Sequence, residues 1–219
     1  MRATLEGACL FARTTRGGAF AHPTKMGLGK GAMAGIDDNR QFLPLRIAVL
    51  TVSDTRELAD DKSGAVLSER IKAAGHVVAE RGIVPDDVTA IRGRVKEWIE
   101  APAVDVIITT GGTGFTGRDV TPEAVEPLFE KRMEAFAVLF LMVSFRKIGT
   151  SAIQTRATAG VAGATYIFCL PGSPGACKDA WDEILVHQLD YRYRPCNFVE
   201  LMPRLDEHLR RPKAQGATV

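Results

Sequence analysis

A glycine-rich loop is the part of this sequence best suited to hold an anion. It reads Gly111-Gly112-Thr113-Gly114 and follows an apolar run that ends at Thr110. Glycine lets backbone N–H groups approach an anion closely, and the start of a following helix adds a partial positive charge. The loop therefore predicts a ligand that carries phosphate.

Charged side chains occur in this loop region and in other loops that follow expected strands. Asp54, Asp86 and Asp119 offer the oxygen ligands that Mg²⁺ prefers, often alongside substrate phosphates. Arg56 and Arg118 offer paired N–H donors to a phosphate. A single Asp after a strand is often only a turn former or a helix cap. In combination these residues indicate a phosphorylated ligand with a metal ion, and nucleotide chemistry above all.

Other chemistries fit the sequence less well. Residues 112–117 satisfy the G-x-G-x-x-G pattern of dinucleotide sites, but that pattern also needs a second strand with an acidic end about twenty residues further on. Residues 130–147 read as helix instead, so a dinucleotide-binding protein is a distant alternative. Residues 172–175 do not match the G-x-S-x-G motif of serine hydrolases. The scattered four cysteines and four histidines fit neither a zinc site nor a disulfide framework.

Alternating strand and helix patterns must position these loops. A continuous apolar run of strand length occupies 45–52, and further strands are expected at 76–84, 104–110 and 166–170. A weaker strand is expected at 155–161, paired with 166–170. Helical periodicity occupies 63–75, 88–99, 122–147 and 173–189. Ser63 is the expected N-cap of the first helix, and Pro127 is expected to kink or restart the third. The alternation predicts an α/β three-layer sandwich, with a mostly parallel sheet and helices on both faces. Ligands of such sheets lie beyond the C-terminal ends of the strands.

The length of 219 residues suits one full-sized domain. We expect an N-terminal extension over 1–42 that is disordered or extraneous, an α/β domain over 43–205 and a C-terminal tail over 206–219. The extension shows no sustained periodicity. Its first forty residues hold six basic and three acidic side chains, so removing this +3 from the net charge of +2 leaves the remainder at about −1.

That balance excludes a basic footprint for nucleic acid on the folded part. No apolar run reaches the roughly 18 residues of a membrane span. Unpaired thiols fit a reducing compartment. We therefore expect a cytoplasmic protein that binds neither nucleic acid nor a membrane.

Five ordered blocks of sequence resemble the MoaB/MogA family of molybdenum-cofactor biosynthesis proteins, and its MoaB branch in particular. They begin at Thr51-Val52-Ser53-Asp54-Thr55-Arg56 and at Thr109-Thr110-Gly111-Gly112-Thr113-Gly114, the latter continuing to Ala124. The others span residues 144–149, 170–174 and 194–198. The resemblance covers about residues 45–203, so the N-terminal forty residues lie outside it.

The resemblance implies a MogA-like, molybdopterin-binding fold and the adenylylation of molybdopterin by Mg²⁺ and ATP with release of pyrophosphate. By position, Asp86 and Asp119 match the catalytic acidic residues and would hold the metal. The remaining residues that we expect to bind the cofactor or nucleotide are Ser53, Asp54, Gly111, Gly112, Thr113, Gly114, Arg156, Pro171, Gly172 and Ser173. The MoaB branch also includes proteins without clear adenylyltransferase activity. A non-catalytic, oligomeric molybdopterin-binding protein is therefore the alternative to the enzyme.

The segment 136–145 predicts a partner subunit. It is apolar almost all round, whereas a helix packed on one side needs a single apolar stripe. At ten residues it is too short to span a bilayer. The resemblance implies a homotrimer or a homohexamer built from trimers, and a helix shared between subunits would explain the composition of this segment.

Overall fold

A six-stranded mixed sheet forms the centre of the computed structural model, which describes residues 34–210. The strand order is β3-β2-β4-β7-β6-β5, and the first four strands run parallel. Strands β6 and β5 add to the sheet in antiparallel register. The strands are β2 (Arg46–Val52), β3 (Val77–Val84), β4 (Val106–Thr110), β5 (Lys131–Arg132), β6 (Thr158–Ala162) and β7 (Thr165–Leu170).

The central strands are apolar throughout because the sheet is covered on both faces. Along β2, Ile47 and Val49 pack into one core, and Ala48 and Leu50 pack into the other. All four side chains are fully buried. Alternate residues of a strand point to opposite faces, so a doubly covered strand reads as a continuous apolar run.

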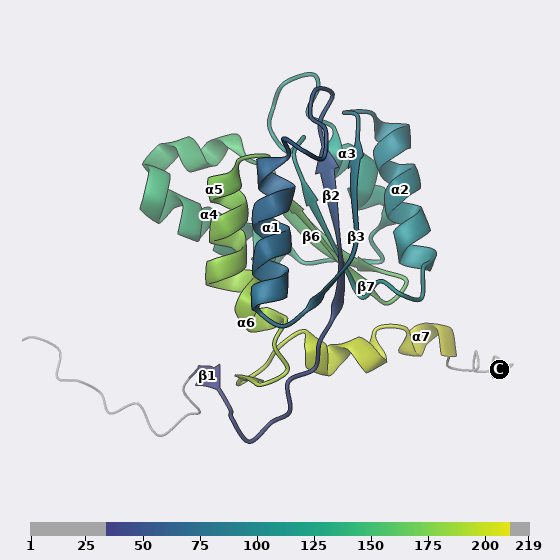
Figure 1. Ribbon diagram of the computed structural model, residues 1–219, viewed down its shortest axis with the longest axis vertical. Coiled ribbons are helices and arrows are strands. Elements are labelled where there is room, and N and C mark those ends of the chain that lie inside the picture. The colour runs from purple at the N-terminus through teal and green to yellow at the C-terminus, as the bar shows by residue number, and fades with distance from the viewer. Residues whose placement is uncertain (1–33, 211–219) are drawn as a thin grey trace, which may run out of the picture. The chain divides into compact units, whose positions relative to one another are not determined.

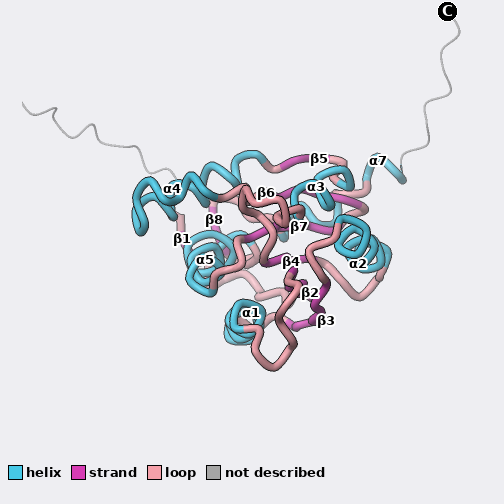
Figure 2. Tube along the Cα trace, turned by 90° about the horizontal axis from the view of Figure 1, so that it is seen from above, coloured by secondary structure: helices cyan, strands magenta, loops and turns pink. Residues whose placement is uncertain are grey.

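Helices cover the two faces of this sheet (Figures 1 and 2). Helices α1, α4 and α5 lie on one face, and α2 and α3 lie on the other. The predicted α/β three-layer fold is therefore confirmed. The helices are α1 (Lys62–Ala73), α2 (Val88–Glu100), α3 (Thr121–Val125), α4 (Glu134–Ile148), α5 (Pro174–Ala180), α6 (Val186–Gln188) and α7 (Glu207–Arg210). A π-helical stretch, Trp181–Leu185, joins α5 to α6, and 3₁₀ helices span Glu126–Leu128, Gly149–Gln154 and Val199–Arg204.

The N-cap of α1 is Asp61, so the expectation of Ser63 is wrong. The Asp61 carboxylate accepts a hydrogen bond from the backbone N–H of Gly64 at 2.9 Å. Asp61 is buried, and the same carboxylate is paired with Arg81 from β3. This tertiary ion pair fixes the cap two residues earlier than the local sequence suggests. Gly75, at φ +88°, directly follows the C-cap residue Ala74 and ends the helical region.

The segment expected as one helix over 122–147 is divided by an edge strand. Helix α3 ends at Val125, the 3₁₀ turn contains Pro127, and β5 follows before α4 starts at Glu134. Lys131 pairs with Val161 of β6 across the edge of the sheet. The two residues of β5 are exposed and basic, so no apolar periodicity predicts a strand there. The weak strand expected over 155–161 exists as β6, paired with β7.

Residues 34–42 belong to the folded unit, which corrects the expected boundary at residue 42. Strand β1 (Gly35–Ile36) pairs with β8 (Tyr193–Arg194), and Arg40 is ion-paired with Glu200. The Arg40 guanidinium also lies over the Tyr191 ring, 3.8 Å from its centroid. The rest of the expected extension, residues 1–33, lies outside the described residues, as does most of the tail.

Helix α4 and the 3₁₀ turn after it form a continuous stretch of 21 residues, Glu134–Gln154, within which 18 consecutive residues have a mean hydropathy of 1.5. By length and composition alone this stretch could cross a membrane, which the count of uninterrupted apolar residues did not reveal. Within the described residues it is the one helix that passes this test. Phe136 and Phe140 pack into the core of the domain, while Leu141 and Phe145 are exposed. An apolar helix against a partner subunit would satisfy the same criteria.

Candidate functional site

A cavity of about 480 Å³ opens where strands β2, β4 and β7 end. These three strands are adjacent and parallel, so their C-terminal loops meet at one edge of the sheet. The lining residues are Val52, Ser53, Thr55, Arg56, Asp86, Gly111, Gly112, Thr113, Gly114, Asp119, Gln154, Thr155, Pro171, Gly172 and Ser173. Ten of the twelve residues predicted for the site therefore share one cavity.

Two glycines of the central loop have backbone conformations that other residues avoid. Gly111 and Gly112 have φ values of +108° and +64°. A Cβ atom at Gly111 would lie 2.3 Å from the carbonyl oxygen of Val52, and one at Gly112 would lie 2.4 Å from Oγ1 of Thr121. Both positions therefore require glycine for steric as well as torsional reasons.

The four carbonyl groups of the loop Gly111–Gly114 are all occupied by protein donors. Thr121 donates through its hydroxyl to Gly111 and through its backbone N–H to Gly112, at 2.8 and 2.9 Å. Arg156 donates through its backbone N–H to Thr113 and through Nε to Gly114, at 2.8 and 2.7 Å. Within the described residues, the N–H groups of Gly112 and Thr113 donate to no protein acceptor.

A trans peptide points its C=O and N–H groups in opposite directions. Because the Gly111 and Gly112 carbonyls are bound to Thr121, the following two N–H groups point away from it, toward the cavity. Backbone donors of this kind bind phosphate oxygens well, because they are already oriented and need no reorganisation. We call the free N–H groups of Gly112 and Thr113 the amide cradle.

Two carboxylates lie beside the amide cradle. A Cβ atom built on Gly112 would lie 3.2 Å from Oδ1 of Asp86, and one built on Gly114 would lie 2.7 Å from Oδ2 of Asp119. Both carboxylates line the cavity. The described residues contain no cluster of three or more His, Cys, Asp or Glu that could hold a metal. Mg²⁺ commonly uses only one or two carboxylates together with substrate phosphates and water, so this pair fits a magnesium–phosphate complex.

The two carboxylates differ in their electrostatic surroundings. Burial, and then the charge of Asp54, raises the pKa of Asp86. Burial would also raise the pKa of Asp119, but hydrogen bonds from Thr116 outweigh it and lower the pKa. The Thr116 hydroxyl and backbone N–H both donate to Oδ2, at 2.7 and 2.8 Å. These contacts favour the anionic form of Asp119 beside the glycine loop.

Asp54 and Arg156, which were also predicted for the site, are not among the residues that line the cavity. Asp54 is ion-paired with Arg118 and accepts a hydrogen bond from the backbone N–H of Asp86 at 3.1 Å. The Arg156 guanidinium donates to two backbone carbonyls, those of Gly114 and Asp119, and pairs with a carboxylate. In this structure both residues contact the loops that form the cavity and do not line it.

Gln154 and Thr155 line the cavity and were missing from the predicted site. They lie just before β6, which is antiparallel to its neighbour, with Thr158 opposite Cys169. The beginning of an antiparallel strand lies at the same edge as the ends of the parallel strands. This position could have been predicted from the expected pairing of 155–161 with 166–170. Two strands so close in sequence pair as an antiparallel hairpin, which brings the start of the first to the end of the second.

All the loops that line the cavity lie in the part of the sequence that matches a protein-family model. The model is described as "Probable molybdopterin binding domain" and matches residues 48–191. Over 158 residues the chain is 50% identical to molybdenum cofactor biosynthesis protein B of Escherichia coli K12, covering 72% of this chain and 93% of the relative. The chain belongs to the molybdenum cofactor biosynthesis protein B family. The resemblance seen in the sequence is thus confirmed.

Other members of this family agree in sequence and in structure. The protein of the same description from Staphylococcus epidermidis is 45% identical over 152 residues, covering 68% of this chain and 86% of the relative. A crystal structure of molybdenum cofactor biosynthesis protein B superimposes with a TM-score of 0.69 at 37% identity, covering 77% of this chain and 99% of the other. The fold described above is therefore that of the family, over nearly the whole length of these relatives.

Proposed function

We propose that the cavity binds molybdopterin together with Mg²⁺-ATP and adenylylates the pterin. A terminal phosphate oxygen of molybdopterin attacks the α-phosphorus of ATP and forms the new P–O bond. The bond between the α-phosphorus and its bridging oxygen breaks, and pyrophosphate leaves with the electron pair. The family membership supports the pterin substrate, and the observation that carries the chemistry is the amide cradle beside Asp86 and Asp119.

The protein's part in such a reaction is positioning and charge neutralisation, because the substrate phosphate is itself the nucleophile. The N–H groups of Gly112 and Thr113 would hold phosphate oxygens. Asp86 and Asp119 would hold the magnesium ion, which neutralises charge that develops on the phosphates. The volume of about 480 Å³ lies in the range of small-molecule sites.

The reaction is tested by incubating the full-length protein with molybdopterin, ATP and Mg²⁺ and separating the products. We expect adenylyl-molybdopterin and pyrophosphate in equal amounts, and neither product when ATP or Mg²⁺ is omitted. Binding of molybdopterin without any product would favour the alternative, a non-catalytic molybdopterin-binding protein. Absence of molybdopterin binding would refute both.

We further propose that the protein acts in the cytoplasm as a homotrimer or a homohexamer. The exposed face of α4 and the turn after it supports an interface, because it carries Leu141, Met142, Phe145 and Ile153 with 44–75% of their surface exposed. These residues line a separate apolar hollow of about 380 Å³. A patch of large apolar side chains of this kind indicates a partner surface. The unpaired thiols, including the exposed Cys196, support a reducing compartment.

A further inference from the structure

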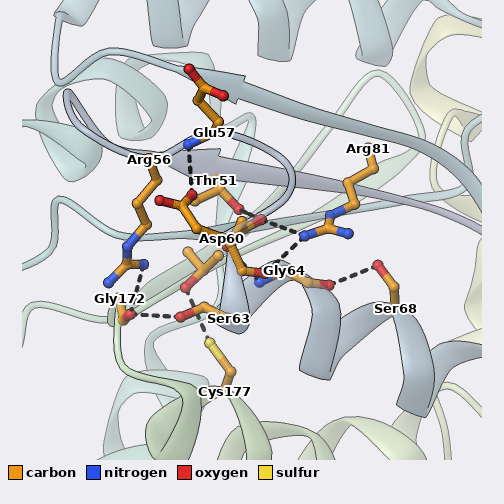
Figure 3. A network of polar contacts seen from close by, with 12 residues as sticks. Thr51, Arg56, Glu57, Asp60, Ser63, Gly64, Ser68, Arg81, Gly172 and Cys177 are labelled. Atoms are coloured by element: carbon orange, nitrogen blue, oxygen red, sulfur yellow. Dashed lines mark hydrogen bonds and ion pairs between the residues drawn. The ribbon is translucent and has the colours of Figure 1, made fainter.

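The loop that follows β7 has its carbonyl groups held mainly by buried side chains, with Arg56 from the cavity lining as a further donor. The Pro171 carbonyl accepts a hydrogen bond from the hydroxyl of Thr110 at 2.9 Å and from the thiol of Cys177 at 3.4 Å. The Gly172 carbonyl accepts one from the hydroxyl of Ser63 at 2.7 Å and a longer one from Arg56 at 3.4 Å. Figure 3 shows Ser63 and Arg56 converging on Gly172.

These contacts fix the direction of the two peptide N–H groups that follow. With the Pro171 and Gly172 carbonyls turned into the protein, the N–H groups of Gly172 and Ser173 point the other way, toward the cavity that both residues line. Neither N–H donates a hydrogen bond to the described part of the chain. They have the same arrangement as the N–H groups of the amide cradle.

The two loops also touch. A Cβ atom on Gly172 would lie 3.2 Å from the Cα atom of Gly111, so the absence of a side chain at Gly172 allows this close approach. The free N–H groups of both loops therefore belong to one wall of the cavity. A ligand phosphate at this wall can accept hydrogen bonds from either loop.

The donors behind this loop are themselves held in place. Thr110 and Cys177 lie 3.1 Å apart between oxygen and sulfur, and both are fully buried. Burial raises the pKa of Cys177 to about 11, so the thiol keeps its proton at neutral pH and can donate. Ser63 is fully buried in the first turn of α1, two residues after its cap residue Asp61.

The cap of α1 ties Ser63 to the sheet. The Asp61 carboxylate accepts hydrogen bonds from the Thr51 hydroxyl at 2.7 Å and from Arg81 at 2.9 Å, in addition to the Gly64 N–H. Thr51 lies on β2 and Arg81 on β3. The position of the Ser63 hydroxyl is therefore set by two strands of the sheet and not only by its own helix.

We propose that Ser63, Thr110 and Cys177 are positioning residues that aim the N–H groups of Gly172 and Ser173 at a phosphate group of the bound ligand. They touch the backbone of the loop and not the ligand. The inference rests on the proposed function, because it takes the ligand to be molybdopterin or ATP. Either ligand supplies the phosphate chemistry that these donors recognise, and the experiment separates the two.

Matched substitutions remove or keep each donor. Thr110→Val removes a hydroxyl at nearly constant volume, and Thr110→Ser keeps it. Cys177→Ala removes the thiol donor, and Cys177→Ser keeps a donor. Ser63→Ala removes one oxygen from a fully buried position. The dissociation constants of molybdopterin, dephosphorylated molybdopterin, ATP and adenosine are measured for each variant, together with the melting temperature.

We expect Ser63→Ala and Thr110→Val to weaken the binding of molybdopterin, ATP or both by about tenfold, and Cys177→Ala to weaken it less. A tenfold change is the size expected when one hydrogen bond from a loop N–H to the charged phosphate is lost. Binding of the dephosphorylated counterparts should stay within about twofold, and the serine variants at 110 and 177 should bind like the unsubstituted protein. The ligand that loses affinity is the one whose phosphate the loop holds.

Two results would overturn the proposal. Unchanged affinity for both phosphorylated ligands in Ser63→Ala and Thr110→Val would show that the loop N–H groups do not need these donors. An equal loss for phosphorylated and dephosphorylated ligands would indicate general loosening of the cavity instead of a lost phosphate contact. If the unsubstituted protein binds neither phosphorylated ligand, the proposed function fails, and this inference fails with it.

Discussion

Asp54 and Arg118 form an ion pair that joins the loop after β2 to the end of the glycine loop after β4. The Arg118 side chain is 69% exposed and that of Asp54 is 33% exposed, so the pair contributes little to stability. The same Asp54 carboxylate also accepts the backbone N–H of Asp86. It therefore connects three of the loops that surround the cavity.

We expect Asp54→Ala to lower the rate of adenylylation by about tenfold, because small displacements of positioning groups reduce catalysis strongly. The melting temperature should change by less than about 2 °C, as for an exposed pair. Steady-state rates and thermal unfolding of the same preparation test this. A matched control is Asp182→Ala, which removes a similar surface pair with Arg70 on α1. An unchanged rate in Asp54→Ala would show that the ion pair does not position the loops.

Asp119→Asn should lower turnover by about a hundredfold or more while the fold persists. The asparagine oxygen can still accept from Thr116, so the loop keeps its conformation, but the charge that would hold Mg²⁺ is lost. Asp38→Asn, an exposed position outside the cavity, serves as the control. If Asp119 were only a turn residue, the variant would lose stability and keep its turnover. Asp86→Asn should resemble Asp119→Asn, and magnesium titration of both variants would measure the loss of metal affinity.

Most of the sheet could be predicted from the sequence because doubly buried strands are continuous apolar runs. Strands β2, β4 and β7 follow this rule, whereas the edge strand β3 is only partly buried and includes Glu80 and Arg81. The order of these strands along the chain placed the loops at one edge. The failure at β5 has the opposite cause: Lys131 and Arg132 are exposed at the edge of the sheet and pair only through their backbone. No side-chain pattern marks such a strand.

The sequence predicts the loops that line the site but not the residues that hold those loops in place. Glycines and carboxylates at strand ends have a local signature, but the residues that orient them do not. The hydroxyl of Thr110 reaches a carbonyl 61 positions away, and Ser63 reaches one 109 positions away. In the sequence each is an ordinary small polar residue beside an apolar run. Their contacts follow from the packing of α1 and α5 against the sheet, which sequence periodicity does not specify.

The stability of the protein should fall as the pH falls below about 6.5, and His76 contributes to this. The Nδ1 atom of His76 accepts the backbone N–H of Leu45 at 3.1 Å, so the folded protein needs this nitrogen unprotonated. Burial lowers the pKa of His76, although the charge of Asp190 acts in the opposite direction. In the unfolded chain a histidine has a pKa of about 6.5. Above that pH, His76 is neutral in both the folded and the unfolded state, and its contribution to the free energy of unfolding is fully present.

As the pH falls through 6.5, the unfolded chain binds a proton at His76 that the folded protein does not, and the free energy of unfolding decreases. Melting temperatures measured between pH 8 and pH 5.5 test this. His76→Asn keeps an acceptor for Leu45 but does not titrate, so its melting temperature should depend less on pH over this range. Equal pH dependence in both proteins would show that other groups cause the effect.

Removal of the first 32 residues should leave folding and ligand binding unchanged. The family model begins at residue 48, and among the described residues the pairing of β1 with β8 begins at Gly35. A chain starting at Met33 keeps β1 and the contacts of Arg40 with Glu200 and Tyr191. A chain starting at Leu43 loses them and should melt several degrees lower, since about 1 kcal/mol corresponds to 2–4 °C in a protein of this size. A lower melting temperature for the chain starting at Met33 than for the full-length protein would contradict the prediction.

Substitution of the exposed face of α4 should separate the subunits. Leu141 and Phe145 are one helical turn apart, are 44% and 57% exposed, and line the same apolar hollow. Glutamate at both positions would place charge in a contact that excludes water, so an oligomer that uses this face should dissociate. The unsubstituted protein should elute with a mass of three or six times 23.7 kDa in light scattering behind a sizing column.

The double variant Leu141→Glu/Phe145→Glu should elute as a monomer. Val77→Glu is the matched control, because Val77 is an equally exposed apolar residue on the edge strand β3, away from α4. It should leave the mass unchanged. Sedimentation with lipid vesicles tests the other role that the length and composition of Glu134–Gln154 would allow. A monomeric mass for the unsubstituted protein, or its capture by vesicles through Leu141 and Phe145, would refute the subunit interface, because the apolar face would then have no second copy to cover it.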